Sequence, residues 1–143
     1  MKKQILTGAA ALVLTAFAPV QTHAQQATQA KIPFAFQAGN TMMPAGEYQI
    51  QRALPTGTTA QLIRRTDSSA STYVLTNAVD SRDKNFNPQL IFHCYTNECF
   101  LSEIWVGSGQ GLKLQQSRRE KELSHASAEN ELAVVSMPLT VTP

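Results

Sequence analysis

Two cysteines, Cys94 and Cys99, have the spacing that most directly predicts chemistry in this chain. They lie near the facing ends of two apolar runs, residues 89–95 and 98–106, that are rich in β-branched and aromatic residues. If Thr96-Asn97 forms the two-residue turn of a hairpin, the cysteines face each other as a non-hydrogen-bonded pair. Cα atoms in such a pair are about 4.5 Å apart, which is within reach of a disulfide. We therefore predict a disulfide between Cys94 and Cys99, formed in an oxidising compartment.

Two other interpretations of the cysteines remain open. They could be reduced and buried, or they could form a redox-active pair. The redox interpretation is weaker because four residues separate Cys94 from Cys99, whereas the oxidoreductase motif has two.

His93 and Glu103 are the weak candidates for acid–base chemistry. The hairpin register that aligns the cysteines places Glu103 opposite Leu90, on the face away from His93. His93 and Cys94 are consecutive in a strand and point to opposite faces, so they are poorly placed to bind one metal ion. We therefore expect no catalytic residue, no metal site and no cofactor.

Residues 1–24 have the three parts of a secretory signal peptide. Lys2 and Lys3 give a positive start, an apolar run follows at residues 5–17, and small residues at positions 22 and 24 favour cleavage between Ala24 and Gln25. The alternative is a membrane anchor, but the apolar run is shorter than the ~20 residues that a spanning helix needs. We expect the mature chain to be periplasmic or secreted.

The mature chain would have about 120 residues, enough for one domain with a buried core. Its formal charge is zero, because Lys2 and Lys3 account for the whole excess of 12 basic over 10 acidic residues. Such a chain has no field that would attract nucleic acid, and it has no second apolar run long enough to span a membrane. We expect residues 25–30 to be a loose leader and residues 31–143 to form a single β domain.

Strand patterns separated by turn residues dominate the mature chain. Expected strands cover residues 31–37, 47–54, 59–65, 72–77, 89–95, 98–106, 112–116 and 132–141. One helix is expected from Ser117 to about Ser127, because Ser117 and Glu120 fit a capping box. The fold class is therefore mainly β, an antiparallel small barrel or sandwich with one short surface helix near the C-terminus.

Several segments resemble a group of small exported proteins common in acidobacteria. The pattern comprises residues 32–36 (IPFAF), 43–48 (MPAGEY) and a central hairpin with FLSEIW at residues 100–105. Its closing segment includes Leu114, Ser117, Glu120 and Leu123. The resemblance implies an exported, mainly β, single domain, and it implies no catalytic residue or activity.

Three functions are compatible with these observations. The first is an exported, non-catalytic module that binds an envelope protein, a surface or a small molecule. The alternative is a β-barrel carrier of a small apolar ligand, with inward aromatic side chains lining a cavity. The second alternative is a small hydrolase-like enzyme that uses His93 or Glu103.

Overall fold

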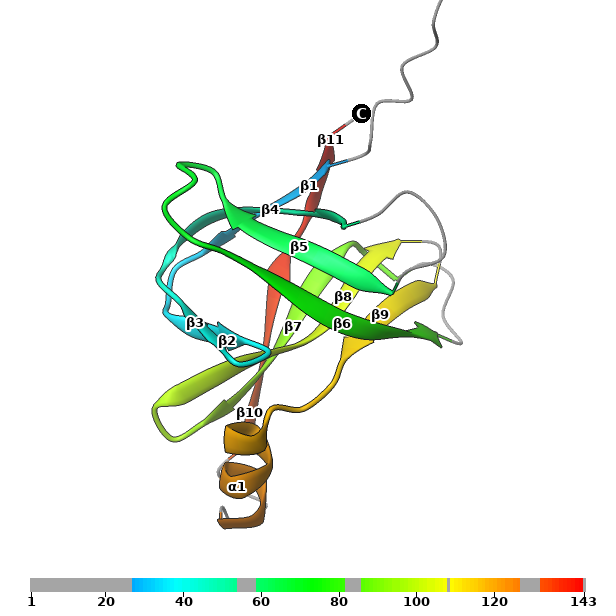
Figure 1. The fold of residues 1–143 in the computed structure, drawn as a ribbon. Coiled ribbons are helices and arrows are strands. Elements are labelled where there is room, and N and C mark those ends of the chain that lie inside the picture. The colour runs from blue at the N-terminus through cyan, green and yellow to red at the C-terminus, as the bar shows by residue number, and fades with distance from the viewer. Residues whose placement is uncertain (1–26, 54–58, 82–85, 108, 127–131, 143) are drawn as a thin grey trace, which may run out of the picture.

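The computed structural model describes residues 27–53, 59–81, 86–107, 109–126 and 132–142 (Figure 1). The expected signal peptide and its cleavage site at Ala24 and Gln25 lie outside these residues.

The fold is mainly β, as the sequence predicts, with one helix near the C-terminus. The strands are β1 (Ala27–Ile32), β2 (Phe36–Ala38), β3 (Thr41–Met43), β4 (Gly46–Arg52), β5 (Ala60–Arg65), β6 (Ser71–Asp80), β7 (Gln89–Tyr95), β8 (Glu98–Gly107), β9 (Gln110–Leu114), β10 (Leu132–Pro138) and β11 (Thr140–Thr142). The helix is α1 (Arg118–Ala126).

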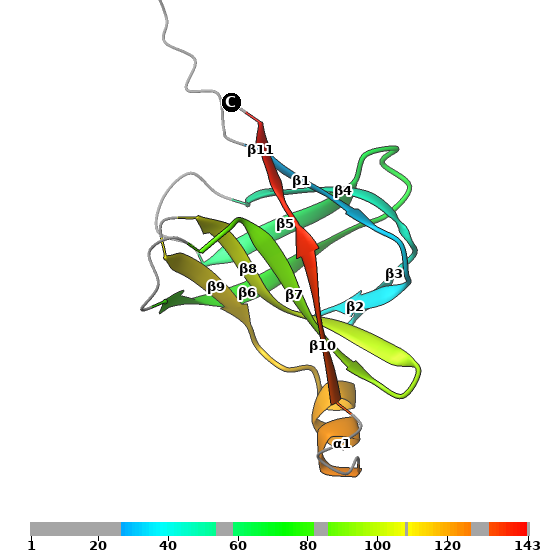
Figure 2. The same cartoon turned by 180° about the vertical axis from the view of Figure 1, so that it is seen from behind.

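The strands form an open, barrel-like sandwich in the order β10-β7-β8-β9-β6-β5-β4-β1-β11. The long strand β6 connects the two halves, because its first part pairs with β5 and its second part pairs with β9. The C-terminal segment connects the opposite edges, with β10 beside β7 and β11 beside β1 (Figure 2). The sequence correctly predicts antiparallel pairing; the short contact between β2 and β8 is parallel.

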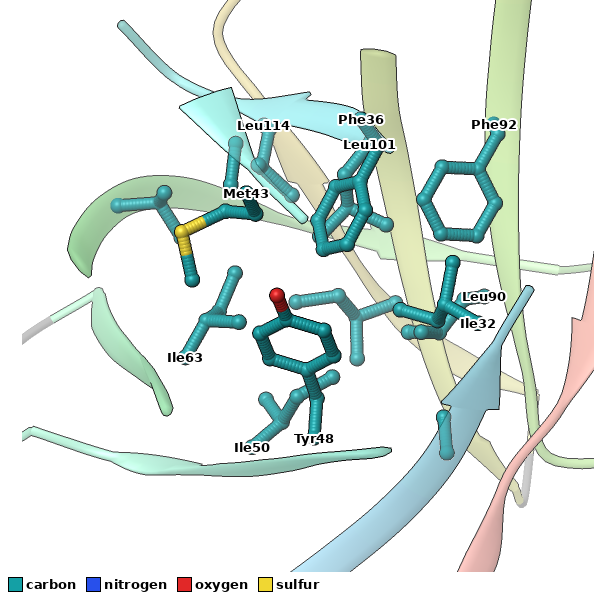
Figure 3. Close-up of a cluster of buried hydrophobic side chains, with 14 of the residues drawn as sticks. Ile32, Phe36, Met43, Tyr48, Ile50, Ile63, Leu90, Phe92, Leu101 and Leu114 are labelled. Atoms are coloured by element: carbon teal, nitrogen blue, oxygen red, sulfur yellow. The ribbon is translucent and has the colours of Figure 1, made fainter. Parts of the chain in front are cut away.

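Side chains that alternate inward along these strands fill the interior. The ring of Phe36 packs edge-to-face against those of Tyr48 and Phe92, with centroids 5.3 Å apart in each case. Figure 3 shows these rings among aliphatic side chains that include Ile63 and Leu101. The inward aromatic residues therefore build a packed core.

The turn between β3 and β4 is fixed by Tyr48, which lies at the end of the segment MPAGEY at residues 43–48. The Tyr48 side chain is 0% exposed, and its hydroxyl donates a hydrogen bond to the carbonyl oxygen of Pro44 at 2.5 Å. Gly46 lies against Arg65, since a Cβ at this position would lie 2.6 Å from Nε of that side chain. The glycine and the tyrosine of this segment therefore each have a structural role, and the backbone carbonyl of Pro44 accepts the hydrogen bond.

The expectation of a loose leader at residues 25–30 is wrong from Ala27 onward. Residues 27–30 belong to β1, where Thr28 and Ala30 are buried and pair with β4. The polar composition of these residues does not suggest a buried strand. Thr28 can nevertheless be buried, because its hydroxyl donates a hydrogen bond to the carbonyl oxygen of Ile50 at 2.9 Å.

The helix begins as the sequence predicts. The backbone N–H of Glu120 donates to Oγ of Ser117 at 3.1 Å, which is the N-cap half of a capping box. The carboxylate of Glu120 is buried against β7, where its Oε1 lies 3.5 Å from Nδ1 of His93. This contact connects the helix to the functional candidates.

Candidate functional site

The predicted hairpin and disulfide are present. Tyr95 pairs with Glu98 and Cys94 pairs with Cys99. A disulfide joins the two cysteines, whose Cα atoms are 4.0 Å apart. The turn requires a φ of 49° at Thr96, in the left-handed region that β-branched residues rarely adopt. Both cysteines are partly buried and pack against the core.

The predicted register beyond the disulfide is wrong for Glu103. A β-bulge shifts the pairing between Ile91 and Phe92, so that Ile91 faces Glu103. Paired residues share a face, and so do alternate residues of a strand. Glu103 therefore lies on the same face as His93, contrary to the expectation. Its carboxylate accepts a hydrogen bond from Nε1 of Trp105 at 2.8 Å.

His93 instead lies beside Glu120 of α1, a neighbour that the sequence analysis did not identify. The exposed fractions of the two side chains are 23% and 4%, respectively. Within the described residues, neither Nδ1 of His93 nor Oε1 of Glu120 has a hydrogen-bond partner that meets good geometry. No local sequence signal joins these residues, because the contact exists only once α1 packs on β7.

Surrounding contacts indicate that this pair belongs to the attachment of the helix. Nε and Nη2 of Arg119 both contact the carboxylate of Glu98, with the shortest distance 2.5 Å from Nη2 to Oε1. Hydrogen bonding from this guanidinium holds the pKa of Glu98 below its usual range. Burial raises the pKa of Tyr95, and the nearby Glu120 carboxylate raises it further. The polar contacts therefore hold α1 against the hairpin that carries the disulfide.

A separate groove opens beside β6. It has a volume of 420 Å³ and is lined by residues 39–41, 72–75 and 114–117. These segments are the turn between β2 and β3, the first half of β6, and the connection from β9 to α1 (Figure 1). The volume is in the range of ligand pockets.

The groove combines an apolar floor with uncharged polar walls. Val74 and Leu114 are buried, and the turn at residues 39–41 and residues 115–117 contribute amide and hydroxyl residues to the lining. Tyr73 and Leu75 are 69% and 62% exposed at its rim. All of the lining residues are uncharged, so the groove suits an uncharged ligand.

The described residues contain no group of three or more His, Cys, Asp or Glu side chains placed to hold a metal ion. Among them, no helix is long and apolar enough to cross a membrane. Comparison of the chain with known protein families, curated proteins and solved structures finds no significant match.

Proposed function

We propose that this protein is an exported, non-catalytic module that binds a partner in the periplasm or outside the cell. The observation that carries the proposal is the groove beside β6, where an apolar floor and uncharged polar walls meet exposed Tyr73 and Leu75. Exposed apolar side chains gathered at a concave site are typical of a binding surface.

The packed interior favours this function over the apolar carrier. The residues that would line a carrier's cavity, such as Phe36, Tyr48 and Phe92, are in contact with one another. A ligand would have to separate these rings and lose their packing.

The surroundings of His93 favour binding over hydrolysis. A hydrolase of this kind needs a base within hydrogen-bonding distance of a nucleophile, at a place that substrate can reach. The carboxylate beside His93 belongs to α1 and is buried against β7, and both cysteine sulfurs are held in the disulfide.

The disulfide supports export, because disulfides persist in oxidising compartments. Together with the signal-like residues 1–24, it leads us to propose cleavage between Ala24 and Gln25. Mass spectrometry of the protein recovered outside the cytoplasm should give a chain that begins at Gln25. Recovery of the full-length chain inside the cell would contradict the proposal.

The binding role can be tested with Leu75→Lys and Val134→Lys. The two side chains are equally exposed, 62% in each case, and both lie on strands, but only Leu75 lines the groove. Each exported variant is purified from the producing cell's envelope and examined by native mass spectrometry. We expect a component that co-purifies with the wild type and with Val134→Lys, but not with Leu75→Lys. Equal retention by all three proteins, or retention by none, would refute a binding role for the groove.

A further inference from the structure

We infer that the groove binds an uncharged peptide segment in extended conformation, which pairs with the free edge of β6 at Tyr73. This inference rests on the proposed function and adds the chemical class of the ligand. It follows from the backbone of β6, which has a neighbour on one side only along its first half.

The register shows which backbone groups of β6 remain available. The N–H of Arg65 donates to the carbonyl of Ala70, and the N–H of Thr76 donates to that of Thr59. Backbone bonds alternate along an antiparallel pair, so even-numbered residues of β6 bond to β5 and odd-numbered ones point the other way. Tyr73 pairs with Leu62 across β5 as a non-hydrogen-bonded pair. Its N–H and carbonyl therefore point to the edge opposite β5.

The strand that could cover this edge ends too early. β9 pairs with the second half of β6, and its last residue, Leu114, faces Thr76. The chain then leaves the sheet toward α1, forming a wall of the groove at residues 115–117. Among the described residues, no strand lies beside Tyr73 on this side. The groove opens along this edge, and the turn between β2 and β3 borders it, with Oγ1 of Thr41 2.9 Å from Oγ1 of Thr72. A peptide strand paired with β6 would displace this contact.

The sequence of this edge lacks the features that prevent strand addition. Free edges in natural sheets are commonly protected by charged side chains, proline or bulges. Residues 71–75 (STYVL) include neither a charged residue nor proline, and no irregularity interrupts their pairing with β5. This five-residue edge is about 17 Å long, enough to pair with a short peptide through main-chain hydrogen bonds.

The groove walls define the peptide's chemistry. A charged side chain would be desolvated there without an opposite charge, because all lining residues are uncharged. Asn40, Gln115 and Gln116 supply amides that can bond to hydroxyl side chains or backbone. We therefore expect alternating small apolar and hydroxyl residues in the ligand. A neutral saccharide could also use the amides and the Tyr73 ring, but it would not need the backbone N–H of Tyr73.

The test uses the acetylated, amidated hexapeptide Thr-Val-Thr-Val-Thr-Val as the probe, with the same peptide N-methylated at alternate residues as its control. Binding to the mature protein is followed by NMR of backbone amides. We expect the unmodified peptide to shift the amide signal of Tyr73 and slow its hydrogen exchange. N-methylation should weaken binding by about tenfold or more, because it removes main-chain donors.

Two substitutions separate the backbone from the side chain. Tyr73→Ala keeps the N–H and should retain binding within about threefold, whereas Tyr73→Pro removes the N–H and should weaken binding by about tenfold or more. In the part of the chain that the structure describes, no strand pairs with this side of Tyr73, and proline is tolerated on an edge strand. If Tyr73→Pro fails to fold, the N-methylated peptide gives the same comparison on the wild-type protein.

The outcomes also separate this inference from the proposed function. If the hexapeptide leaves the Tyr73 amide unchanged, or if N-methylation has no effect, strand addition is refuted. A neutral glucose hexasaccharide can then be added in place of the peptide. If it shifts the amide signals of the groove residues, and if Tyr73→Ala abolishes these shifts, the groove binds a saccharide and the proposed function stands. The binding role itself fails if Leu75→Lys leaves the co-purifying components unchanged, or if no component co-purifies with the wild type.

Discussion

Removing one hydroxyl from the core should measurably destabilise the protein. In Tyr48→Phe the ring still packs against Phe36, but the hydrogen bond to the carbonyl of Pro44 is lost. Because Pro44 itself is exposed, water can reach part of the site. The loss of stability should therefore be near the lower end of the range for removing a buried hydrogen bond. We expect a loss of about 1 kcal/mol in the free energy of unfolding.

The assay is urea denaturation with the disulfide intact, combined with thermal unfolding. A loss of about 1 kcal/mol corresponds to a decrease of about 4 °C in Tm for a domain of this size. Tyr73→Phe is the matched control, because it makes the same change at a side chain that is 69% exposed. It should change stability by less than about 0.5 kcal/mol. Equal effects of the two substitutions would refute the assigned role of the Tyr48 hydroxyl.

The same variant predicts a difference at alkaline pH. Burial raises the pKa of Tyr48, Arg65 lowers it by a smaller amount, and Asp67 raises it slightly. The folded chain therefore keeps this proton at a pH at which the unfolded chain has lost it. The resulting stability is complete below about pH 10 and is lost as the pH rises through the folded pKa. Tyr48→Phe should lose less stability than the wild type over this range, and an identical loss would contradict the reasoning.

Three further predictions concern the hairpin and the helix packed on it. Thr96→Gly should raise the free energy of unfolding by about 1 kcal/mol in urea denaturation, because glycine adopts the φ of 49° without strain; a loss of stability would refute this. Arg119 lowers the pKa of Glu98, so stability from this pair is present above the unfolded pKa and is lost as the pH falls through the folded pKa. Glu98→Gln should reduce the dependence of the free energy of unfolding on pH in this acidic range. An unchanged dependence would contradict a stabilising interaction between Glu98 and Arg119. Replacing Cys94 and Cys99 together by Ala should lower the free energy of unfolding by about 2 kcal/mol in urea denaturation, because the disulfide closes a short loop. Complete unfolding of this variant would show that the disulfide does more than restrict the unfolded chain.

Local patterns in the sequence are sufficient to predict much of the fold. Alternation of apolar residues predicts β5, β7 and β8 closely, and the capping serine predicts the start of α1. The disulfide is also predictable, because a two-residue turn determines which residues face each other on either side of it. These features depend on neighbours within a few residues in the chain, so their physical causes are visible in the sequence.

The arrangement around the candidate sites was decided by tertiary structure. One extra residue at the bulge in β8 moved Glu103 to the face of His93, and no composition signal marks that residue. Glu120 reached His93 because α1 folds back onto β7, and residues 27–30 became a strand because β4 and β11 lie on either side of them. The groove exists because β9 ends opposite Thr76 and leaves the edge of β6 uncovered. Such contacts join segments far apart in the chain, and their energies depend on packing that no local pattern of residues contains.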